Sequence, residues 1–420
     1  MEKITAPRGT KDVLPEESRA WQILEEKLRN LAHRFGFREI RFPTFEDAAL
    51  FNRGVGDTTD VVQKEMYDFY DKGDRHIALR PEGTASVVRS VIEHSLHTGT
   101  LPLKVYYIAP NFRYEKPQAG RLREHHQFGI ECFGAADATA DAEVISLGAT
   151  LLRELGITSC VLHLNSCGCP ECRKVYHAAL KAYFETKKDK LCETCNDRFD
   201  RNPMRILDCK SEICKSIAKD APKITDFLCD SCREHFEKLQ GCLRSMNIDF
   251  VLDPMVVRGL DYYTNTVFEF VSEKIGAQGT VLGGGRYNGL VESLGGPSLP
   301  GLGFGCGIER LMLSLEAEGR LDNERLVPEI FVAHADAQSE MFCQQLVYEL
   351  RALGVHAERD TTGRSLKAQM KYAGKTGAKY SAVIGGSEIE NKKVTLKDME
   401  SGETAECGLC AAEICDKLKG

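Results

Sequence analysis

The stretch RGLDYYTNTVFEF at residues 258–270, followed by GGGRYNGL at residues 283–290, decides how this chain is interpreted. The apolar residues around Phe268 favour a β-strand. Arg258 and Asp261 would need specific partners if that strand were buried, because an unpaired buried polar group is costly. Three consecutive glycines in the second stretch allow a ligand to come close to the backbone. The two stretches together predict a ligand pocket; a surface hairpin with a flexible glycine turn is the alternative.

Length and composition limit the class of protein. A chain of 420 residues is expected to form two or more domains. Its 42% hydrophobic and 28% charged residues are globular values. The net charge of -7 argues against indiscriminate coating of nucleic acid, although a local basic groove remains compatible with it. The opening MEKITAPRGTKDVLPEE has no apolar signal-peptide core and no run has membrane-spanning length, so we expect a cytoplasmic protein without a membrane partner.

Cysteines are concentrated in one part of the chain. Eleven of the seventeen lie between Cys160 and Cys242. A disulfide framework is not expected in a reducing compartment, so paired spacing favours zinc. We expect the first two C-x2-C pairs, 19 residues apart, to form one tetrathiolate zinc site and the other four cysteines a second; small buried thiols that pack a helical insert are the alternative. In chain order, the pairs are Cys169 and Cys172, Cys192 and Cys195, Cys209 and Cys214, and Cys229 and Cys232.

Hydrophobic periodicity predicts how the chain is organised. An amphipathic helix is expected over residues 16–36, and a Cys-rich helical insertion over residues 166–245. Strands that adjoin through short turns predict an antiparallel sheet. Residues 1–325 are expected to form the larger domain, and residues 328–420, where strands alternate with helices, a small α/β domain. The strands of the larger domain are expected at 37–46, which Pro43 interrupts, and at 104–114, 125–134, 159–165, 249–253, 263–271 and 278–284.

Residues 112–134, FRYEKPQAGRLREHHQFGIECFG, predict two strands joined by a loop. Arg113 and Glu115 share one face of the outgoing strand, and Gln127 and Glu131 share one face of the returning strand. Two antiparallel strands can therefore present an arginine, carboxylates and an amide to a single ligand. A surface hairpin with ordinary charge pairs is the alternative.

This hairpin resembles motif 2 of the class II aminoacyl-tRNA synthetases. GLGFGCGIERL at 301–311 resembles their motif 3, and FREIRFPTFE at 37–46 resembles motif 1. RGLDYYTNTVFEF and GGGRYNGL resemble the two signatures of the histidyl-tRNA synthetase family, which APRGTKDVLPEE and LRPEGT at 79–84 also fit. The resemblance runs nearly from end to end, with the motifs in the family's order.

The resemblance implies a class II α+β catalytic domain on an antiparallel sheet, with a C-terminal anticodon-binding domain. It implies activation of L-histidine by ATP and Mg2+, then transfer to the 3′ end of tRNA(His). Arg113 and Arg258 correspond to the catalytic arginines that hold the α-phosphate. The family's ATP-binding positions correspond to Arg113, Glu115, Arg121, His125 and Arg310. Its histidine-binding positions correspond to Glu82, Gly83, Thr84, Arg113, Gln127, Glu131, Arg258, Tyr262, Tyr263 and Tyr287.

The resemblance also implies partners. These are tRNA(His), whose acceptor end the loop 116–123 would contact, and a second copy of the chain, joined through motif 1. The competing interpretation is a non-catalytic regulatory subunit of ATP phosphoribosyltransferase, but this chain keeps Arg113, Glu115, Arg258 and Arg310, and such subunits usually lack the lysine-bearing α/β tail found here. A synthetase-like domain of a stress kinase would require a kinase domain, of which the sequence shows no signature. We expect seven lysines to give that tail a locally basic surface: Lys367, Lys371, Lys375, Lys379, Lys392, Lys393 and Lys397.

Overall fold

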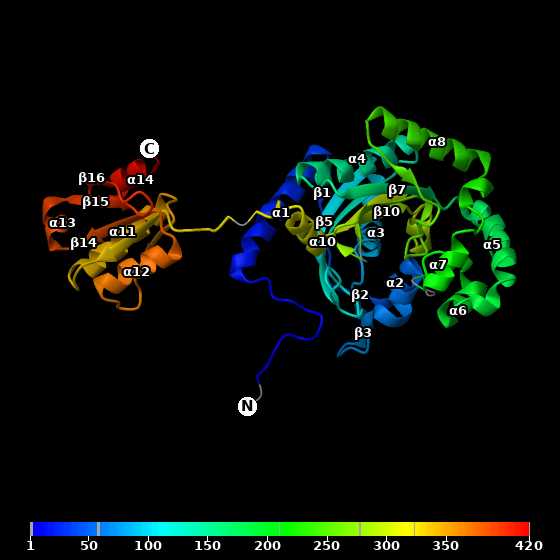
Figure 1. The fold of residues 1–420 in the computed structure, drawn as a ribbon, viewed down its shortest axis with the longest axis horizontal. Helices are drawn as coiled ribbons and strands as arrows, with labels where there is room; N and C mark the ends of the chain where they lie inside the picture. The colour runs from blue at the N-terminus through cyan, green and yellow to red at the C-terminus, as the bar shows by residue number, and fades with distance from the viewer. Residues whose placement is uncertain (1–2, 57–58, 210, 277–278, 323, 420) are drawn as a thin grey trace. The chain divides into compact units, whose positions relative to one another are not determined.

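The computed structural model describes residues 3–56, 59–209, 211–276, 279–322 and 324–419. The chain divides into two compact units, Met1–Asn323 and Glu324–Gly420 (Figure 1). Within the described residues, no helix is both long and apolar enough to cross a membrane.

The first unit is built on an eight-stranded sheet with the order β1-β5-β6-β11-β10-β9-β7-β8. Neighbours from β5 to β7 are antiparallel, whereas the short strands β1 and β8 at the two edges are parallel to their neighbours. The expected antiparallel sheet is confirmed for its inner strands. The strands are β1 (Arg38–Glu39), β5 (Leu103–Phe112), β6 (Glu124–Phe133), β7 (Cys160–Ser166), β8 (Val251–Leu252), β9 (Thr264–Ser272), β10 (Thr280–Arg286) and β11 (Gly301–Gly307).

Helices cover both faces of this sheet because its strands bury alternate residues on opposite sides. On β5, Tyr106 packs into the core shared with α1 (Pro15–Arg34), α4 (Ala138–Glu154) and α10 (Ile308–Ala317). Its neighbour Tyr107 packs with α3 (Thr84–Glu93) and α9 (Leu290–Ser293) on the other face. The expected amphipathic helix is α1, which buries Leu24, Leu28 and Leu31.

A three-stranded sheet with the order β2-β4-β3 was not expected from the sequence. Its strands are β2 (Phe45–Asp47), β3 (Tyr67–Tyr70) and β4 (His76–Leu79), next to α2 (Ala48–Val55). Phe69 and Tyr70 are exposed. The alternation of buried and exposed residues that marks a strand in the sequence is therefore weak here.

The Cys-rich segment forms the expected helical insertion, which lies between β7 and β8 (Figure 1). Its helix α8 packs against α4 of the main core through residues such as Phe236 and Leu239. The insertion helices are α5 (Pro170–Glu185), α6 (Glu193–Arg201), α7 (Glu212–Ala218) and α8 (Asp230–Ser245).

The second unit is a five-stranded sheet with the order β13-β12-β14-β15-β16. The first three of these strands are parallel, as the predicted alternation of strands and helices requires. The short helix α13 (Gly386–Asn391) and the edge strand β16 were not expected. The other elements are β12 (Ile330–His334), β13 (Ala357–Arg359), β14 (Tyr380–Ile384), β15 (Lys393–Asp398), β16 (Thr404–Gly408), α11 (Ser339–Ala352), α12 (Leu366–Thr376) and α14 (Ala411–Lys419).

A fully buried ion pair anchors the end of β10 to α4. The Arg286 guanidinium donates from Nε to Asp141 Oδ1 at 2.9 Å and from Nη2 to Oδ2 at 2.6 Å. Its remaining donors bond the backbone oxygens of Ala135 and Asp137 at 2.8 and 2.9 Å. The pair therefore fixes the residue that directly precedes Tyr287.

Replacing Asp141 by alanine should lower the free energy of unfolding of this unit by about 3–5 kcal/mol, because Arg286 would remain buried without its counter-charge. Urea unfolding followed by the fluorescence of Trp21, the single tryptophan, reports this unit alone. Lys11→Ala, which breaks an exposed pair with Glu17, is the control and should cost less than about 1 kcal/mol. Equal losses in the two variants would contradict the prediction.

Candidate active site

A cavity of about 400 Å³ opens between the β5–β6 hairpin, β10 and the start of α10. Its wall brings together residues that are far apart in the sequence. All five residues expected at the ATP site line it, as do Arg258 and Gln127. The five are Arg113, Glu115, Arg121, His125 and Arg310.

Contacts with the backbone and with carboxylates hold the arginines of this cavity in place. Arg113 Nε donates to the carbonyl oxygen of Pro81 at 2.8 Å. Arg310 donates from Nε to Gly120 O at 3.2 Å and from Nη1 to Thr280 O at 2.5 Å. Arg121 forms an ion pair with Glu115.

Positive charge is crowded in this cavity. Burial lowers the pKa of Arg310, and repulsion from Arg121, Arg113 and Arg258 lowers it further. Carboxylates line the same wall, Glu115 and Glu269 among them. Fixed guanidinium groups that converge on one desolvated space suit a polyanionic ligand, and planar guanidinium groups suit phosphate oxygens.

His125 faces this cationic group as a neutral imidazole. Burial and the nearby charges of Arg113 and Arg310 lower its pKa to about 3. A neutral ring can stack on a planar ligand without adding to the positive charge. Its neighbour His126 is held instead by Glu309, to which it donates from its backbone nitrogen at 2.9 Å.

Several of the expected histidine-binding residues form a buried network around Glu131. Thr84 Oγ1 donates to Glu131 Oε1 at 2.7 Å, and the Tyr287 hydroxyl donates to Oε2. Glu82 is also buried. Its carboxylate accepts hydrogen bonds from the backbone nitrogens of Thr84 and Ala85, at 2.8 Å each, within the turn that contains Gly83. The network therefore presents two carboxylates from separate elements, α3 with its preceding turn and β6.

Aromatic rings close this network. The ring centroids of Tyr262 and Tyr263 lie 4.7 Å apart, and those of Tyr262 and Tyr287 lie 5.7 Å apart. The guanidinium of Arg258 lies 5.7 Å from the centre of the Tyr263 ring. Arg258 also lines the cavity that holds the expected ATP-binding residues, so this side chain touches both regions.

Gln127 is a second link between the two regions, and it depends on residues that the sequence analysis did not single out. Its Oε1 accepts from Asn111 Nδ2 at 2.9 Å and from the Tyr107 hydroxyl at 3.3 Å. Asn111 and Tyr107 lie on β5, directly across the hairpin from β6. A polar side chain within a run of strand residues is the signal that could have identified Asn111.

Glu269 was also missed. It lies on β9 within the quoted stretch VFEF, forms an ion pair with Arg258, and accepts from Thr280 Oγ1 at 2.8 Å. The same requirement for partners that singled out Arg258 applies to a carboxylate between two phenylalanines of one strand.

The three glycines of β10 differ from the expectation that they leave room for a ligand. A Cβ at Gly283 would collide with the Arg258 guanidinium, and one at Gly284 with the backbone of β11. One at Gly285 would collide with Thr266 O. Only Gly283 lines the cavity, so these glycines mainly admit the chain's own groups.

The paired cysteines gather in two groups of four, with the ligand atoms of each group within 4.8 Å of one another. The expected combination of the first two C-x2-C pairs is wrong. The N-terminal turns of α5 and α8 meet, which brings together cysteines at the two ends of the insertion, whereas the middle of the insertion folds on itself. The groups are Cys169, Cys172, Cys229 and Cys232, and Cys192, Cys195, Cys209 and Cys214.

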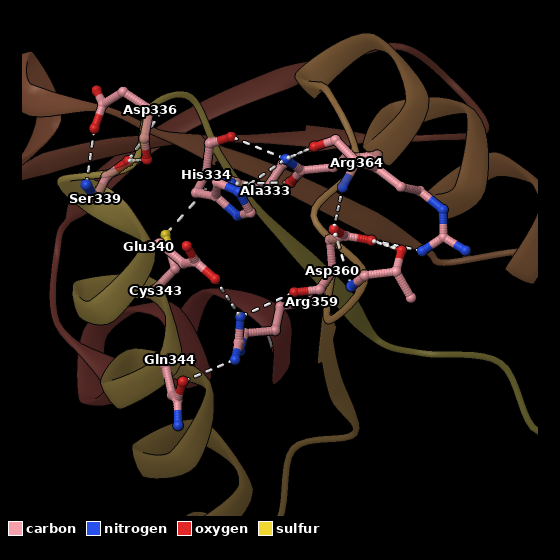
Figure 2. Close-up of polar contacts among 12 residues, drawn as sticks. Ala333, His334, Asp336, Ser339, Glu340, Cys343, Gln344, Arg359, Asp360 and Arg364 are labelled. Carbon is pink, nitrogen blue, oxygen red and sulfur yellow. Dashed lines mark hydrogen bonds and ion pairs between the residues drawn. The ribbon is translucent and has the colours of Figure 1, made fainter.

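The second unit carries a polar cluster where its parallel strands end, as Figure 2 shows. Gln369 of α12 is buried and bonds both the backbone nitrogen and oxygen of His334, at 3.1 and 3.2 Å. Asp360, also buried, accepts from Arg364 at 2.5 Å. The Nδ1 atom of His334 is buried without a partner. The carboxyl ends of parallel strands commonly form ligand sites.

Comparison with known proteins bears on both units. Residues 9–311 match the profile of the histidyl-tRNA synthetase family. This chain belongs to that family. Residues 329–419 match the profile of an anticodon binding domain.

Relatives of the family extend over almost the whole chain. A histidine--tRNA ligase of Caldanaerobacter subterraneus subsp. tengcongensis is 54% identical over 401 residues, 96% of each chain. One from Acetivibrio thermocellus is 53% identical over 404 residues, 96% of this chain and 97% of the relative. A crystal structure of apo histidyl-tRNA synthetase from S. aureus, 39% identical, matches with a TM-score of 0.84 over all of both chains. The expected family and fold class are confirmed.

The buried carboxyl of Glu131 makes a prediction about pH. Burial raises its pKa to about 8, despite hydrogen bonds from Tyr287 and Thr84 that favour the ionised form. In an unfolded chain the pKa of this carboxyl would be about 4.3. Between these two pKa values, Glu131 is protonated in the folded chain but ionised in the unfolded chain. The free energy of unfolding therefore falls as pH rises through this range.

The variant Glu131→Gln should therefore show a smaller loss of unfolding free energy between pH 5.5 and pH 8 than the unchanged chain. Urea unfolding followed by Trp21 fluorescence at the two pH values measures the difference. The variant Glu124→Gln, at the half-buried start of the same strand, is the control. Identical pH dependence of the unchanged chain and the Glu131 variant would show that Glu131 does not titrate in this window.

Proposed function

We propose that this chain activates L-histidine with ATP to histidyl-adenylate and transfers the histidyl group to the 3′ end of tRNA(His). The observation that carries the proposal is the convergence of Arg113, Arg121, Arg258 and Arg310 on one cavity beside a buried network of carboxylates and phenols. The family relatives at 53–54% identity, named histidine--tRNA ligase, support the same activity.

The chemical difficulty in activation is charge, because a carboxylate must attack an α-phosphate that is itself negative. Arg113 and Arg258 are the proposed catalytic residues: they line the same cavity and would stabilise the negative charge that develops on the α-phosphate. Arg310 and His125 are proposed to lie against the adenine, and Glu115 to accept from its exocyclic amine. Arg121, which is paired with Glu115, would complete the polyphosphate site.

Recognition of histidine is assigned to the buried network. Glu131 and Tyr263 would bond the imidazole nitrogens, while Glu82, Thr84 and Gln127 bond the ammonium group. Gly83, Tyr262 and Tyr287 would line the pocket. An apolar side chain of the same shape would leave buried polar groups unpaired, so the site would reject it without an editing reaction.

Metal ions and partners extend the proposal. Mg2+ would bridge the polyphosphate and neutralise part of its charge. Zn2+ is the proposed ion for the two cysteine groups, since thiolates in groups of four favour it. The chain is proposed to act as a cytoplasmic homodimer through residues 37–46. Residues 1–325 would form the catalytic domain, 166–245 its insertion, and 328–420 the anticodon-binding domain.

A solved structure bears on the regulatory-subunit alternative. An ATP phosphoribosyltransferase regulatory subunit/histidyl-tRNA synthetase from Bacillus halodurans matches with a TM-score of 0.65 over 92% of this chain and 99% of the other, at 21% identity, which supports a common fold only. A regulator would have no need of the cationic cavity. Histidine-dependent exchange between ATP and pyrophosphate separates the two functions, because a regulator would show none.

Replacing Arg113 by alanine should lower the rate of histidine-dependent ATP–pyrophosphate exchange by 100-fold or more, corresponding to about 3 kcal/mol of lost transition-state stabilisation. Arg113→Lys should recover only part of the rate, because an ammonium cannot reproduce the planar fork of donors. Arg153→Ala, at an exposed position on α4, is the control and should keep full activity. An Arg113→Ala variant as active as this control would refute the assigned role.

The second unit is proposed to bind the anticodon. Lys367, Lys371 and Lys375 recur every four residues along α12 and are exposed, so they form one basic stripe. Gln369 of the same helix is buried and bonds the backbone of His334, so the polar cluster lies on the helix face away from the stripe. The stripe would hold the phosphate backbone, and the cluster would present hydrogen-bonding groups to unstacked bases.

The double variant Lys367→Glu, Lys371→Glu should bind tRNA(His) more weakly. The slope of log affinity against log salt concentration should become shallower by about 2, because each phosphate contact that is lost no longer releases a counterion. Filter binding of labelled tRNA at several salt concentrations measures both effects. ATP–pyrophosphate exchange should stay unchanged and serves as the internal control. Unaltered affinity and salt slope would place tRNA binding elsewhere on the surface.

A further inference from the structure

The group Cys192, Cys195, Cys209 and Cys214, called here the inner tetrad, lies in the insertion close to the nucleotide cavity. Cys192 and Cys209 line the same recess as Arg113 and Glu115. The outer tetrad, Cys169, Cys172, Cys229 and Cys232, joins the two ends of the insertion. All eight are free thiols.

The spacing of the sulfurs fits a tetrahedral ion. A Zn–S bond of about 2.3 Å places the sulfurs of a regular tetrahedron about 3.8 Å apart. The Sγ atoms of Cys192 and Cys209 are 3.8 Å apart, and those of Cys169 and Cys172 are 3.5 Å apart. Thiols that served only as apolar filling would have no reason to converge four at a time on two points.

Backbone donors also point at these sulfurs. Cys192 N donates to Cys214 Sγ at 3.3 Å, and Ser211 N donates to Cys209 Sγ at 3.4 Å in the inner tetrad. In the outer tetrad, Cys229 N donates to Cys172 Sγ at 3.1 Å. Such bonds orient the thiolates of metal sites and stabilise their negative charge.

The segment between Cys195 and Cys209 contacts the catalytic region directly. Arg205 Nη1 donates to the backbone oxygen of Arg258 at 3.0 Å, and Asn202 donates to Asp261 at 3.2 Å. Asp208, the residue before Cys209, lines the nucleotide cavity.

A second anchor ties this segment to the catalytic unit. Arg198 of α6 forms an ion pair with Asp60 at 2.6 Å and also bonds Arg205 O at 3.2 Å. The charge of Arg198 lowers the pKa of Asp60 against the effect of burial, which raises it. The segment is therefore held to the inner tetrad at both ends, Cys195 and Cys209, and to the catalytic region by the side chains between them.

From these contacts we propose that each tetrad binds one Zn2+ and that the inner ion positions Arg258. By fixing Cys195 and Cys209, the inner ion holds Arg205 against the backbone of Arg258, whose guanidinium enters the nucleotide cavity. The outer ion closes the base of the insertion without touching that cavity. Arg205 is a positioning residue, and this role rests on the proposed activation of histidine. The proposal of the two metal sites does not depend on that activity.

Metal analysis of the full chain, purified without added zinc, tests the sites independently of activity. We expect about two zinc ions per chain, and about one in each of the variants Cys195→Ser and Cys232→Ser. Cys242→Ser, which alters an insertion cysteine outside both tetrads, is the matched control and should keep two. Zinc well below one ion per chain in the unchanged protein, or an unchanged content in both tetrad variants, would overturn the proposal.

The cysteine variants can fail to fold, so a second test replaces the bound zinc by cobalt in the unchanged chain. Removal of the metal by a chelator and titration with Co2+ should give the absorption of tetrahedral tetrathiolate cobalt, saturating at two ions per chain. Saturation without thiolate-to-cobalt absorption would show that the cysteines are not the ligands.

The positioning role is tested with Arg205. The variant Arg205→Ala should lower kcat for ATP–pyrophosphate exchange about tenfold, the cost of one lost hydrogen bond, with little change in KM for histidine. Arg205→Lys should recover most of the rate, and both variants should keep two zinc ions. Full activity of Arg205→Ala would overturn the positioning role; an inactive unchanged chain that still holds two zinc ions would instead count against the proposed function.

Discussion

The arrangement of polar groups in the catalytic unit depends on a steric condition: neighbouring strands must leave out a side chain where the site groups cross them. A Cβ at Gly283 of β10 would occupy the position of the Arg258 guanidinium, and one at Gly303 of β11 would occupy that of the Glu131 carboxylate. Adjacent strands lie only about 4.8 Å apart, so a side chain that lies across a neighbouring strand needs the space that a Cβ on that strand would fill. The glycines therefore belong to the site although they contribute no functional group.

The same crowding accounts for the electrostatics. Arginines and carboxylates line the same small cavity, so the charge of each group depends on its neighbours. Burial and repulsion lower the pKa of Arg310, burial raises that of Glu131, and His125 remains neutral. Positive charge is concentrated in one region and protonated or hydrogen-bonded carboxyls in the next. A ligand that combines a polyphosphate with an amino acid would match this division.

Much of this arrangement could be predicted from the sequence, because strand periodicity and the order of the motifs are local properties. The inner sheet strands, the insertion and the tail domain were predicted on that basis. Contacts between distant segments were not. The ion pair of Arg286 with Asp141, which are 145 residues apart in the chain, is one such contact.

The cysteine grouping failed for a related reason. Adjacent C-x2-C pairs were combined because ligand spacing was judged along the chain, whereas the helix starts of α5 and α8 meet in space. The small sheet β2-β4-β3 was missed because its exposed aromatic residues hide the usual alternation. Periodicity predicts elements, but it does not predict which elements become neighbours.

The parallel pairing of β7 with β8 constrains how the insertion can vary among relatives. His163 pairs with Val251 and Leu164 with Leu252, so the chain must return to the end of the sheet from which β7 began. Antiparallel strands can be joined by a two-residue turn, but a parallel pair requires a crossover of about a dozen residues or more. Evolution or engineering can therefore lengthen, shorten or exchange the insertion, but it cannot reduce this connection to a hairpin without losing the edge strand.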